Sequence, residues 1–423
     1  MTIKRRQVLK NAAYLSAMAA LPLGLSTACF RHQKQKVVVI GGGFAGATAA
    51  RYLAMWAPEL DITLIEKNRQ FISCPQSNLV LSGSRNLSQL THNYSALQTD
   101  KAIRFVQSEV IAVDTENRQL WLADESRVDY DRLIIAPGVS FIYDQLPILA
   151  TAEAQEHVPH AWKAGEQTLL LANQLKSMRQ GGVVIMTVPA APFRCPPGPY
   201  ERACQIALHL KQHNPTGKLL ILDANPDIVS KKALFTEAWQ QQYDGLIEYQ
   251  PMNPLESVNV ANLEVESFFD RYQADVLNVI PPQKAGAVAA MAGVINVDNR
   301  WCDVDFLTYE STAVERVHVI GDAVAAKLPK SAHIANQQAK VCVAAVIALL
   351  RDELPEQQPI FSNTCYSFVD GRQAGHVAAV YRYDKNSQDM VPHPSGGVSE
   401  TASEQEGRYA QGWAENIWAD TLG

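Results

Sequence analysis

A chain of 423 residues, of which 47 % are hydrophobic and 19 % charged, is long enough for roughly two or three domains with cores of their own. Its formal net charge of −6 at pH 7 gives no reason to expect nucleic acid as a partner. The 7 cysteines are too few for a disulfide scaffold of this size, so each has to be interpreted individually.

Residues 1–28 have the pattern of a twin-arginine export signal. Arg5 and Arg6 precede an apolar stretch, residues 12–28, that is short and interrupted by serine, proline and glycine, so no membrane span is expected in the mature chain. An amphipathic helix of the mature domain is disfavoured because a polar linker follows, at residues 31–36. Cys29, directly after the expected cleavage site at Ala28, leaves a lipoprotein signal open. The signal predicts a periplasmic protein that is exported already folded, with its cofactor.

A dinucleotide-binding βαβ unit is predicted over residues 36–66. The apolar run 36–40 predicts a buried parallel strand, residues 47–56 a helix, and residues 61–65 a second strand. Gly41 permits the tight turn, Gly43 lets the backbone approach a pyrophosphate, and Gly46 lets helix and strand pack closely. Glu66 ends the second strand, where an acid binds a ribose hydroxyl. This acid favours FAD or NAD over NADP.

Two later strand ends favour FAD. Residues 130–138 predict a strand followed by a turn of small residues that includes Ala136 and Gly138, the pattern found where flavoprotein chains cross between domains. Residues 317–323 predict a buried strand that ends in Gly321 and Asp322, and in two-dinucleotide-fold flavoproteins an aspartate at this place holds the ribityl chain. A helix is predicted from Ser331 to Leu350, with its N-terminus beside the flavin ring, where its dipole favours an anionic reduced flavin.

A second βαβ unit is predicted, but its turn is altered. Residues 181–188 predict a strand, residues 200–211 a helix and residues 218–223 another strand. The connecting residues 189–201 are rich in proline, which removes amide donors, and bulky side chains keep a pyrophosphate away. NAD(P)H is therefore not expected to be the electron source. Cys195 lies where a hydride donor would otherwise enter.

These motifs together resemble the flavoprotein subunit of flavocytochrome c sulfide dehydrogenase, within the sulfide:quinone oxidoreductase group. The proline-flanked cysteine sequence is the most specific of the matching stretches, which extend over nearly the whole chain after the signal. They comprise residues 71–74, Ser77 and Asn78, residues 193–202, 279–283, 301–302, 321–322, 329–331, 363–367 and 416–418.

The resemblance implies oxidation of hydrosulfide to sulfur or polysulfide by a redox-active disulfide next to FAD. Cys195 and Cys365 match the two redox cysteines, and Glu201 matches an acid near them. Cys74 matches a cysteine to which FAD is covalently attached, and Lys330 falls among the cofactor-binding residues. Electrons are then expected to pass singly to a separate c-type cytochrome subunit. The chain has no Cys-x-x-Cys-His sequence for a haem of its own, and no metal site is predicted.

Plainer interpretations of these residues remain open. Cys74 can be a free cysteine in a loop, and Cys195 and Cys365 can form a purely structural disulfide. Glu201 can be an acid that complements the helix dipole in a first turn. The other cysteines of the mature domains are expected to be structural, and Cys342 in particular to be a small core residue of an apolar helix. The other two are Cys204 and Cys302.

The expected fold is α/β, with two Rossmann-like dinucleotide-binding domains and a C-terminal α+β segment. The FAD-binding domain is discontinuous in sequence, and the C-terminal segment is rich in Tyr and Trp that cover the flavin, contact the cytochrome or pack between domains. The expected boundaries are 1–28 for the signal, 36–150 and 271–350 for the FAD-binding domain, 151–270 for the altered NAD-like domain, and 354–423 for the C-terminal segment.

Two other functions compete with a periplasmic sulfide dehydrogenase. A quinone reductase at the membrane surface would need a basic amphipathic C-terminal helix, whereas residues 404–423 carry several acids. A non-catalytic electron-transfer flavoprotein would have no use for Cys195, Cys365 and Glu201. Sulfide oxidation is therefore the main hypothesis from the sequence.

Overall fold

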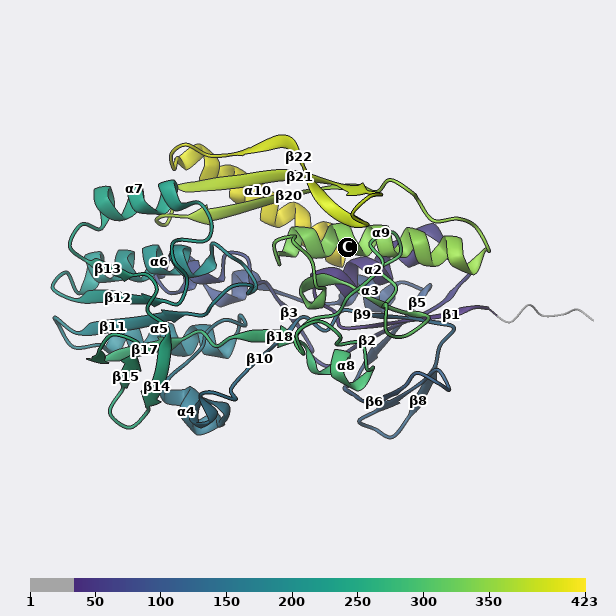
Figure 1. Ribbon diagram of the computed structural model, residues 1–423, viewed down its shortest axis with the longest axis horizontal. Coiled ribbons are helices and arrows are strands. Elements are labelled where there is room, and N and C mark those ends of the chain that lie inside the picture. Colours follow the sequence, from purple (N-terminus) through teal and green to yellow (C-terminus); the bar gives the residue numbers. More distant parts are fainter. Residues whose placement is uncertain (1–33) are drawn as a thin grey trace, which may run out of the picture. The chain divides into compact units, whose positions relative to one another are not determined.

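The computed structural model describes residues 34–423 (Figure 1). The expected export signal, residues 1–28, and Cys29 lie outside the described residues. The expected domain boundaries remain predictions. The residues from Gln35 onward form one compact unit.

A five-stranded parallel sheet forms the first dinucleotide-binding fold, in the order β19-β9-β1-β2-β5. Its central strand is buried along most of its length, as its β-branched residues predict. The sheet takes four strands from the first third of the chain and one from near residue 318, so the fold is discontinuous in sequence. The strands are β1 (Lys36–Ile40), β2 (Asp61–Glu66), β5 (Ile103–Gln107), β9 (Arg132–Ile135) and β19 (Val317–Val319).

Two long helices, α2 (Phe44–Trp56) and α9 (Ala332–Leu350), pack against each other in the same core as this sheet. The predicted start of α9 is confirmed, because Ser331 is its N-cap and accepts a hydrogen bond from the Ile334 amide at 3.2 Å. Helix α2 begins at Phe44, three residues before the predicted start at Ala47, directly after the N-cap Gly43.

Helix α9 is the one helix in the described part of the chain that is long and apolar enough to cross a membrane, judged by length and composition alone. Its most apolar stretch has a mean hydropathy of 1.3, and 56 % of that stretch is buried inside the protein. Packing of the buried face in the core accounts for this composition.

The second sheet is parallel, with the strand order β13-β12-β11-β17. Strand β12 (Lys218–Asp223) spans the predicted residues 218–223. Helix α6 begins at Gly198, two residues before the predicted start at Tyr200. The strands are β11 (Val183–Val188), β12 (Lys218–Asp223), β13 (Ile247–Gln250) and β17 (Val276–Val279). The helices beside them are α5 (Glu166–Ser177), α6 (Gly198–His213) and α7 (Lys232–Gln242).

The C-terminal segment forms an antiparallel sheet of β20 (Ile360–Phe368), β21 (Ala374–Asp384) and β22 (Asp389–Val398), followed by helix α10 (Glu404–Leu422). Strand β20 contacts α6 of the second fold and α9 of the first. In Figure 1 this sheet lies along the helices of both folds. It therefore covers the region where the two folds meet.

Smaller elements complete the fold. Short antiparallel sheets are formed by β6 (Val110–Asp114), β7 (Gln119–Leu122) and β8 (Arg127–Asp129), by β14 (Leu255–Asn259), β15 (Glu264–Ser267) and β16 (Arg271–Gln273), by β3 (Phe71–Ile72) with β4 (Thr91–His92), and by β10 (Val139–Phe141) with β18 (Gln283–Ala285). The remaining helices are α3 (Ser95–Thr99), α4 (Ala152–His157), α8 (Ala287–Met291) and the 3₁₀ turns Ser77–Val80, Leu87–Leu90, Pro147–Ala150 and Gly321–Ala323.

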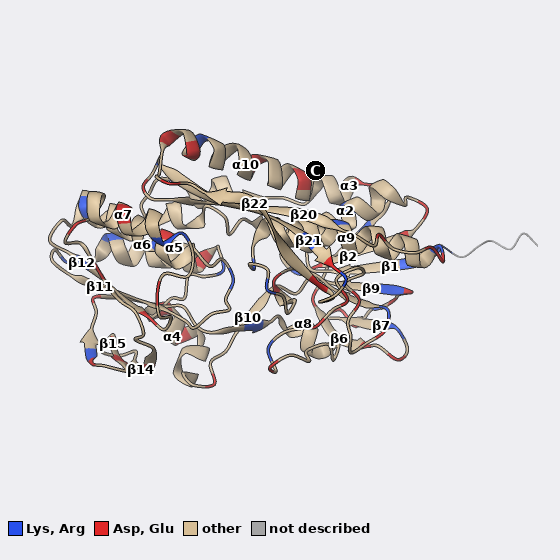
Figure 2. Cartoon of the chain, turned by 45° about the horizontal axis from the view of Figure 1, so that its top comes forward, with Lys and Arg blue, Asp and Glu red and all other residues tan. Residues whose placement is uncertain are grey.

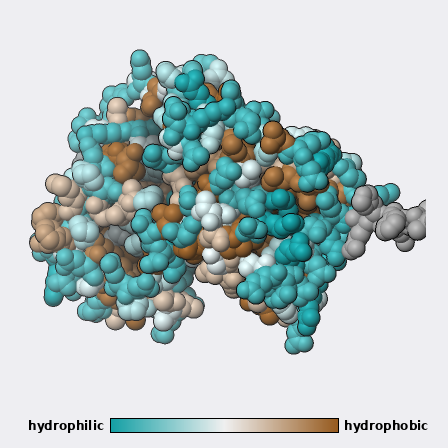
Figure 3. Space-filling view, turned by 45° about the vertical axis from the view of Figure 1, so that its right-hand side comes forward, coloured by the Kyte–Doolittle hydropathy of each residue, from teal (hydrophilic) through white to brown (hydrophobic). Residues whose placement is uncertain are grey.

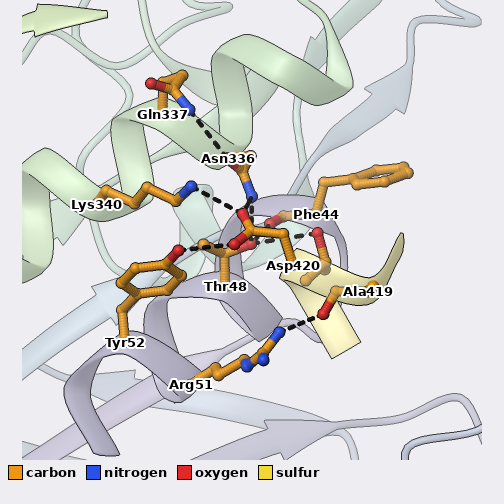
Figure 4. Close-up of polar contacts among 10 residues, drawn as sticks. Phe44, Thr48, Arg51, Tyr52, Asn336, Gln337, Lys340, Ala419 and Asp420 are labelled. Carbon is orange, nitrogen blue, oxygen red and sulfur yellow. Dashed lines mark hydrogen bonds and ion pairs between the residues drawn. The ribbon is translucent and has the colours of Figure 1, made fainter. Parts of the chain in front are cut away.

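A polar cluster fixes the end of α10 to α2 and α9 (Figure 4). The Asp420 carboxylate accepts hydrogen bonds from Tyr52 at 2.7 Å and from Asn336 at 2.7 Å. It also forms an ion pair with Lys340 at 2.8 Å, and Arg51 donates to the neighbouring Ala419 carbonyl. These contacts hold α10 in place, and its middle turns help to line the pocket described below.

Replacing Asp420 with asparagine is expected to lower the free energy of unfolding by about 1–2 kcal/mol at neutral pH. Partial burial by itself raises the pKa of the Asp420 carboxyl, but hydrogen bonds from Lys340, Tyr52 and Asn336 outweigh burial and lower that pKa. A carboxyl with a lowered folded-state pKa stabilises the fold above its unfolded-state pKa, and this contribution is lost as pH falls through the folded-state pKa.

Urea unfolding at several pH values measures this effect. The difference between the unaltered protein and Asp420→Asn should shrink in acid, whereas Glu415→Gln, at an exposed acid on the same helix, should behave like the unaltered protein. A difference that is independent of pH would contradict this account of Asp420.

Candidate active site

One pocket lies where the two folds and the C-terminal segment meet. Every predicted site residue lines it except Gly41 and Gly46, which belong to the glycine turn and the first turn of α2. Those that line it are Gly43, Glu66, Cys74, Ala136, Gly138, Cys195, Glu201, Gly321, Asp322, Lys330 and Cys365.

The glycine turn has a steric reason at each position. Gly41 has φ +100°, and a Cβ there would lie 2.5 Å from the Ala136 carbonyl oxygen. A Cβ on Gly46 would lie 1.8 Å from the Gly41 carbonyl oxygen, so close packing of helix and strand excludes any side chain. Around Gly43 there is open space within 4 Å, which is the room that a pyrophosphate at the N-terminus of α2 needs.

Glu66 lies at the end of β2, buried against the glycine turn. One carboxylate oxygen accepts a hydrogen bond from the Gly42 amide, and the other accepts from the Asn68 amide at 2.7 Å and its side chain at 2.6 Å. These bonds fix the carboxylate in the position where a ribose hydroxyl is bound in such folds.

Asp322 and Lys330 also line the pocket. Burial raises the pKa of the Asp322 carboxyl, and the nearby charges of Arg194 and Lys330 oppose this effect. The Lys330 ammonium donates to the carbonyl oxygens of Asp322 at 2.8 Å and Val324 at 2.7 Å, and it lies 3.8 Å from the centre of the Trp301 ring. Lys330 therefore stiffens the turn that presents Asp322.

The residues present fit a flavin nucleotide. Three buried polar atoms of pocket-lining residues have no partner within the protein: Oε1 of Gln76, Nε1 of Trp162 and Nε of Arg194. A buried polar atom without a partner costs about 1–3 kcal/mol, so a polar ligand in this pocket would relieve that cost. Within residues 34–423, no group of three or more His, Cys, Asp or Glu is arranged to hold a metal ion.

Cys74 lies in the pocket wall on the turn that follows β3. Its carbonyl accepts hydrogen bonds from the Ser77 amide at 3.0 Å and the Ser77 hydroxyl at 2.7 Å, which hold the turn. The guanidinium of Arg194 is a charged neighbour of Cys74, and the Cys74 sulfur helps to raise the pKa of Arg194. A thiol beside a guanidinium in a flavin-sized pocket is suited to form a thioether.

Cys195 has an unusual backbone conformation for a residue with a side chain. Its φ is +58°, and its amide donates to the Lys330 carbonyl at 2.8 Å across the boundary between the two folds. Gly198 leaves room for the sulfur, because a Cβ at this position would lie 3.0 Å from Cys195 Sγ. Strain of this kind, on the order of 1–3 kcal/mol, is common at functional sites.

Cys365 comes from the middle of β20 and lines the same pocket. Both Cys195 and Cys365 are free thiols here, and the disulfide between them remains a prediction. Burial raises the pKa of both thiols, and the proximity of Cys365 raises that of Cys195 further. The fold thus brings together two cysteines that are 170 residues apart in sequence.

Glu201 lies in the first turn of α6, buried beside the two cysteines. Burial raises the pKa of its carboxyl, although the Phe368 amide at 2.9 Å and the Asn78 side chain at 2.8 Å donate hydrogen bonds to it. A carboxyl with a raised pKa is a better proton acceptor near neutral pH than an ordinary glutamate. The geometry therefore suits a proton-transfer role as well as complementing the helix dipole.

The other three cysteines of the described chain lie in cores, as predicted. Cys342 is fully buried in α9, and Cys302 is fully buried in the same cluster. Cys204 on α6 is also fully buried and accepts a hydrogen bond from the Trp239 indole at 3.3 Å.

The nucleotide position of the second fold is closed by the protein's own side chains. Asp223 ends β12, where a ribose-binding acid would lie, but it is fully buried. Its carboxylate accepts hydrogen bonds from the hydroxyls of Tyr200 at 2.8 Å and Tyr249 at 3.0 Å, and from Asn225. Asn225 in turn donates to the Pro189 carbonyl at 3.0 Å, which ties down the proline-rich loop.

Two residues of the site, one in the pocket lining and one behind it, were not found from the sequence. Trp162 lies in a connecting loop, and Lys231, just behind Cys365, lies in a loop of the second fold, so no local pattern marks either of them. The aromatic residues of the C-terminal segment lie in two places. Tyr366 and Trp413 line the pocket. Trp418, Tyr381 and Tyr383 pack with the core of the first fold.

Three family models match the chain. The central domain of the flavoprotein chain of sulfide dehydrogenase (flavocytochrome c) matches residues 168–281, and the flavin-binding domain of flavocytochrome c sulphide dehydrogenase matches residues 357–422. Pyridine nucleotide-disulphide oxidoreductase matches residues 35–183. Together they extend over most of the described residues.

Individual relatives agree with these matches. A sulfide dehydrogenase (flavocytochrome c) flavoprotein chain of Chlorobaculum thiosulfatiphilum is 48 % identical over 46 residues, which are 11 % of this chain and 96 % of that sequence. A mitochondrial sulfide:quinone oxidoreductase of Dictyostelium discoideum is 22 % identical over 74 % of this chain and 70 % of that protein. The solved sulfide:quinone oxidoreductase of Aquifex aeolicus has the same fold, with a TM-score of 0.73 and 18 % identity over 92 % of this chain and 91 % of that one.

Proposed function

Since this chain belongs to the family of flavocytochrome c sulfide dehydrogenase flavoprotein chains, we propose that it oxidises hydrosulfide through a Cys195–Cys365 disulfide and passes electrons to a c-type cytochrome subunit in the periplasm. The chain is an FAD-binding oxidoreductase of sulfide oxidation. One observation supports the proposed oxidation of hydrosulfide through a Cys195–Cys365 disulfide. Two cysteines and a buried acid, from two segments far apart in the sequence, meet in the pocket that holds the flavin-binding residues.

The reaction begins with proton transfer and sulfur exchange. Hydrogen sulfide gives a proton to the Glu201 carboxylate, which its raised pKa equips for this role. The resulting hydrosulfide attacks one sulfur of the disulfide. A new S–S bond forms in a persulfide, the old S–S bond breaks, and its electron pair remains on the other cysteine as a thiolate. A second hydrosulfide that removes the persulfide sulfur as polysulfide leaves two reduced cysteines.

The flavin, when bound, accepts two electrons from the dithiol and releases them singly. Gly43, Glu66 and Asp322 would hold its nucleotide and ribityl parts, and Cys74 would fix its ring covalently. The N-terminus of α9, whose residues Ser331, Ala332 and His333 line the pocket, places partial positive charge there. These residues would hold a bound flavin in the pocket that Cys195 and Cys365 also line.

The partner and the location follow from the same proposal. The twin-arginine pattern of residues 1–28 supports export to the periplasm, where soluble c-type cytochromes are the acceptors that the family implies. Helix α10 carries the acids Glu404, Glu406, Glu415 and Asp420 but one base, Arg408, a charge balance unsuited to an anionic membrane surface (Figure 2). On the face shown in Figure 3, small hydrophobic areas lie scattered among hydrophilic ones.

NADH is expected not to reduce the flavin at a rate that supports turnover. The ribose-binding position of the second fold is taken by Asp223 with its tyrosine partners, and the loop of residues 189–199 offers no glycine cradle. Anaerobic mixing with excess NADH, followed by flavin absorbance, measures this directly. Dithionite provides the positive control, and rapid bleaching by NADH would show that the second fold still binds a nicotinamide.

An acceptor assay tests the proposed function. Sulfide should reduce a soluble c-type cytochrome in the presence of the protein, with a rate that saturates in sulfide. A water-soluble quinone should be a poor acceptor by comparison. Faster turnover with the quinone would favour the sulfide:quinone oxidoreductase function, and no turnover with either acceptor would favour the non-catalytic flavoprotein.

A further inference from the structure

Lys231 is a buried cation directly behind the redox cysteines. It is 7 % exposed and lies at the N-cap of α7 with a left-handed φ of +54°. Its ammonium donates to the backbone carbonyl of Cys365 at 2.7 Å and to the Ser367 hydroxyl at 2.8 Å. A lysine of the second fold therefore reaches into the C-terminal sheet, at the residue that carries one of the two sulfurs.

Burying the charged Lys231 ammonium would cost free energy if this side chain served only packing. Taking an ammonium out of water is unfavourable unless its partners compensate, and here both bonding partners are neutral. The neighbouring Lys232 shows the ordinary alternative, since it is 61 % exposed and pairs with Asp227 on the surface. The Glu201 carboxylate, whose raised pKa the charge of Lys231 partly offsets, supplies part of this compensation, and a second anion close to Lys231 would add to it.

The charged and titratable groups around Cys365 show which anion this is. Burial raises the pKa of the Cys365 thiol, Lys231 lowers it, and Glu201 from α6 raises it. His333 from α9 accepts a hydrogen bond from the adjacent Thr364 amide at 3.0 Å. For Cys195, burial raises the thiol pKa well above its usual value, and the cations that oppose this are Arg194 and then Lys231. Lys231 is thus the cation that stands directly behind Cys365.

We propose that Lys231 is a positioning residue whose buried charge stabilises the thiolate of Cys365, so that Cys365 is the sulfur that departs when hydrosulfide opens the disulfide. The inference rests on the proposed function and states which of the two sulfurs hydrosulfide attacks and which one departs. Hydrosulfide bonds to Cys195 Sγ, the Cys195–Cys365 bond breaks, and the electron pair stays on Cys365. The persulfide forms on Cys195, because a sulfur whose thiolate is more stable leaves faster.

Thiol reactivity in the reduced holoprotein tests the charge effect without any sulfide. The rate of Cys365 alkylation by iodoacetamide, followed by peptide mass spectrometry across a pH series, reports its thiolate fraction. In Lys231→Gln this rate should fall about tenfold at neutral pH, and its pH profile should move upward by about one unit. Lys231→Arg keeps the charge and should restore the rate, and Lys232→Gln is the matched surface control.

A purely structural lysine gives a different result. Its replacement would lower the stability of the fold while leaving the alkylation profile of Cys365 unchanged, and that outcome would overturn the proposal. The direction is tested separately by adding one equivalent of sulfide to the oxidised protein without oxygen and trapping the products. The persulfide is expected on Cys195, and a persulfide on Cys365 would overturn the assigned order.

The two proposals can fail separately. If sulfide does not react with the unaltered protein, the proposed function fails, whatever the alkylation profile shows. If sulfide reacts normally and Lys231→Gln leaves Cys365 alkylation unchanged, the role of Lys231 fails and the proposed function stands.

Discussion

Replacing Cys195 or Cys365 with serine is expected to slow sulfide-dependent reduction of the flavin by on the order of a thousandfold or more, the scale reached when a nucleophile is removed. Serine keeps the size of the side chain but forms neither a disulfide nor a persulfide. Stopped-flow mixing with sulfide under anaerobic conditions measures the rate. Both variants should keep their flavin and be reduced normally by dithionite.

Cys342→Ser provides the matched control for these two variants. It places a hydroxyl in the apolar core formed by α9, so it should cost about 1–3 kcal/mol of stability and leave the sulfide reaction intact. Peptide mapping of the oxidised protein without reductant should show Cys195 linked to Cys365. A link from Cys195 to Cys342, or full sulfide turnover by Cys365→Ser, would contradict the assignment.

Replacing Cys74 with alanine is expected to convert a covalently bound flavin into one that acid releases completely. The thiol lies in the wall of the pocket that holds the flavin-binding residues, beside the Arg194 guanidinium. Acid precipitation of the unaltered protein should leave the yellow colour in the pellet, and Cys74→Ala should transfer it to the supernatant.

Cys302→Ala serves as the control, because Cys302 is buried in the core and does not line the pocket. Its flavin should remain in the acid pellet. Free flavin in the supernatant of the unaltered protein would show that Cys74 is an ordinary thiol.

Much of the first fold could be predicted because its signals are local. The order of strand, glycine turn, helix, strand and acid specifies a βαβ unit within about 30 residues. The structure gives Gly41 and Gly46 steric roles that no other residue satisfies. Ser331 marks the start of α9 equally well, because an N-cap is defined by its own helix.

The predicted starts of helices were less accurate where a glycine or a proline lies at the start of the helix. Helix α6 includes Gly198 and Pro199, which the sequence prediction left in the loop, although proline is well suited to a first turn because no helical partner is needed for its nitrogen. Helix α2 similarly begins directly after Gly43. Glu201 lies in the first turn of α6 with either start, so the difference does not alter its place in the site.

The electrostatic surroundings of the cysteines could not be predicted, because they depend on contacts between distant segments. Lys231 belongs to a pair of lysines with no sequence pattern that separates the buried one from the exposed one. The tyrosine partners of Asp223 are likewise 23 and 26 residues away in sequence. Contacts of this kind between residues far apart in the sequence become visible only in the folded chain.

Anaerobic titration of the oxidised protein with sulfide, followed by the flavin absorbance, tests the central claim most directly. The cysteine pair should deliver the electrons of sulfide to the flavin, so the absorbance should bleach at about two equivalents of sulfide per flavin in the unaltered protein and remain unchanged in Cys365→Ser. A protein whose flavin is bleached by dithionite but not by excess sulfide would contradict the account.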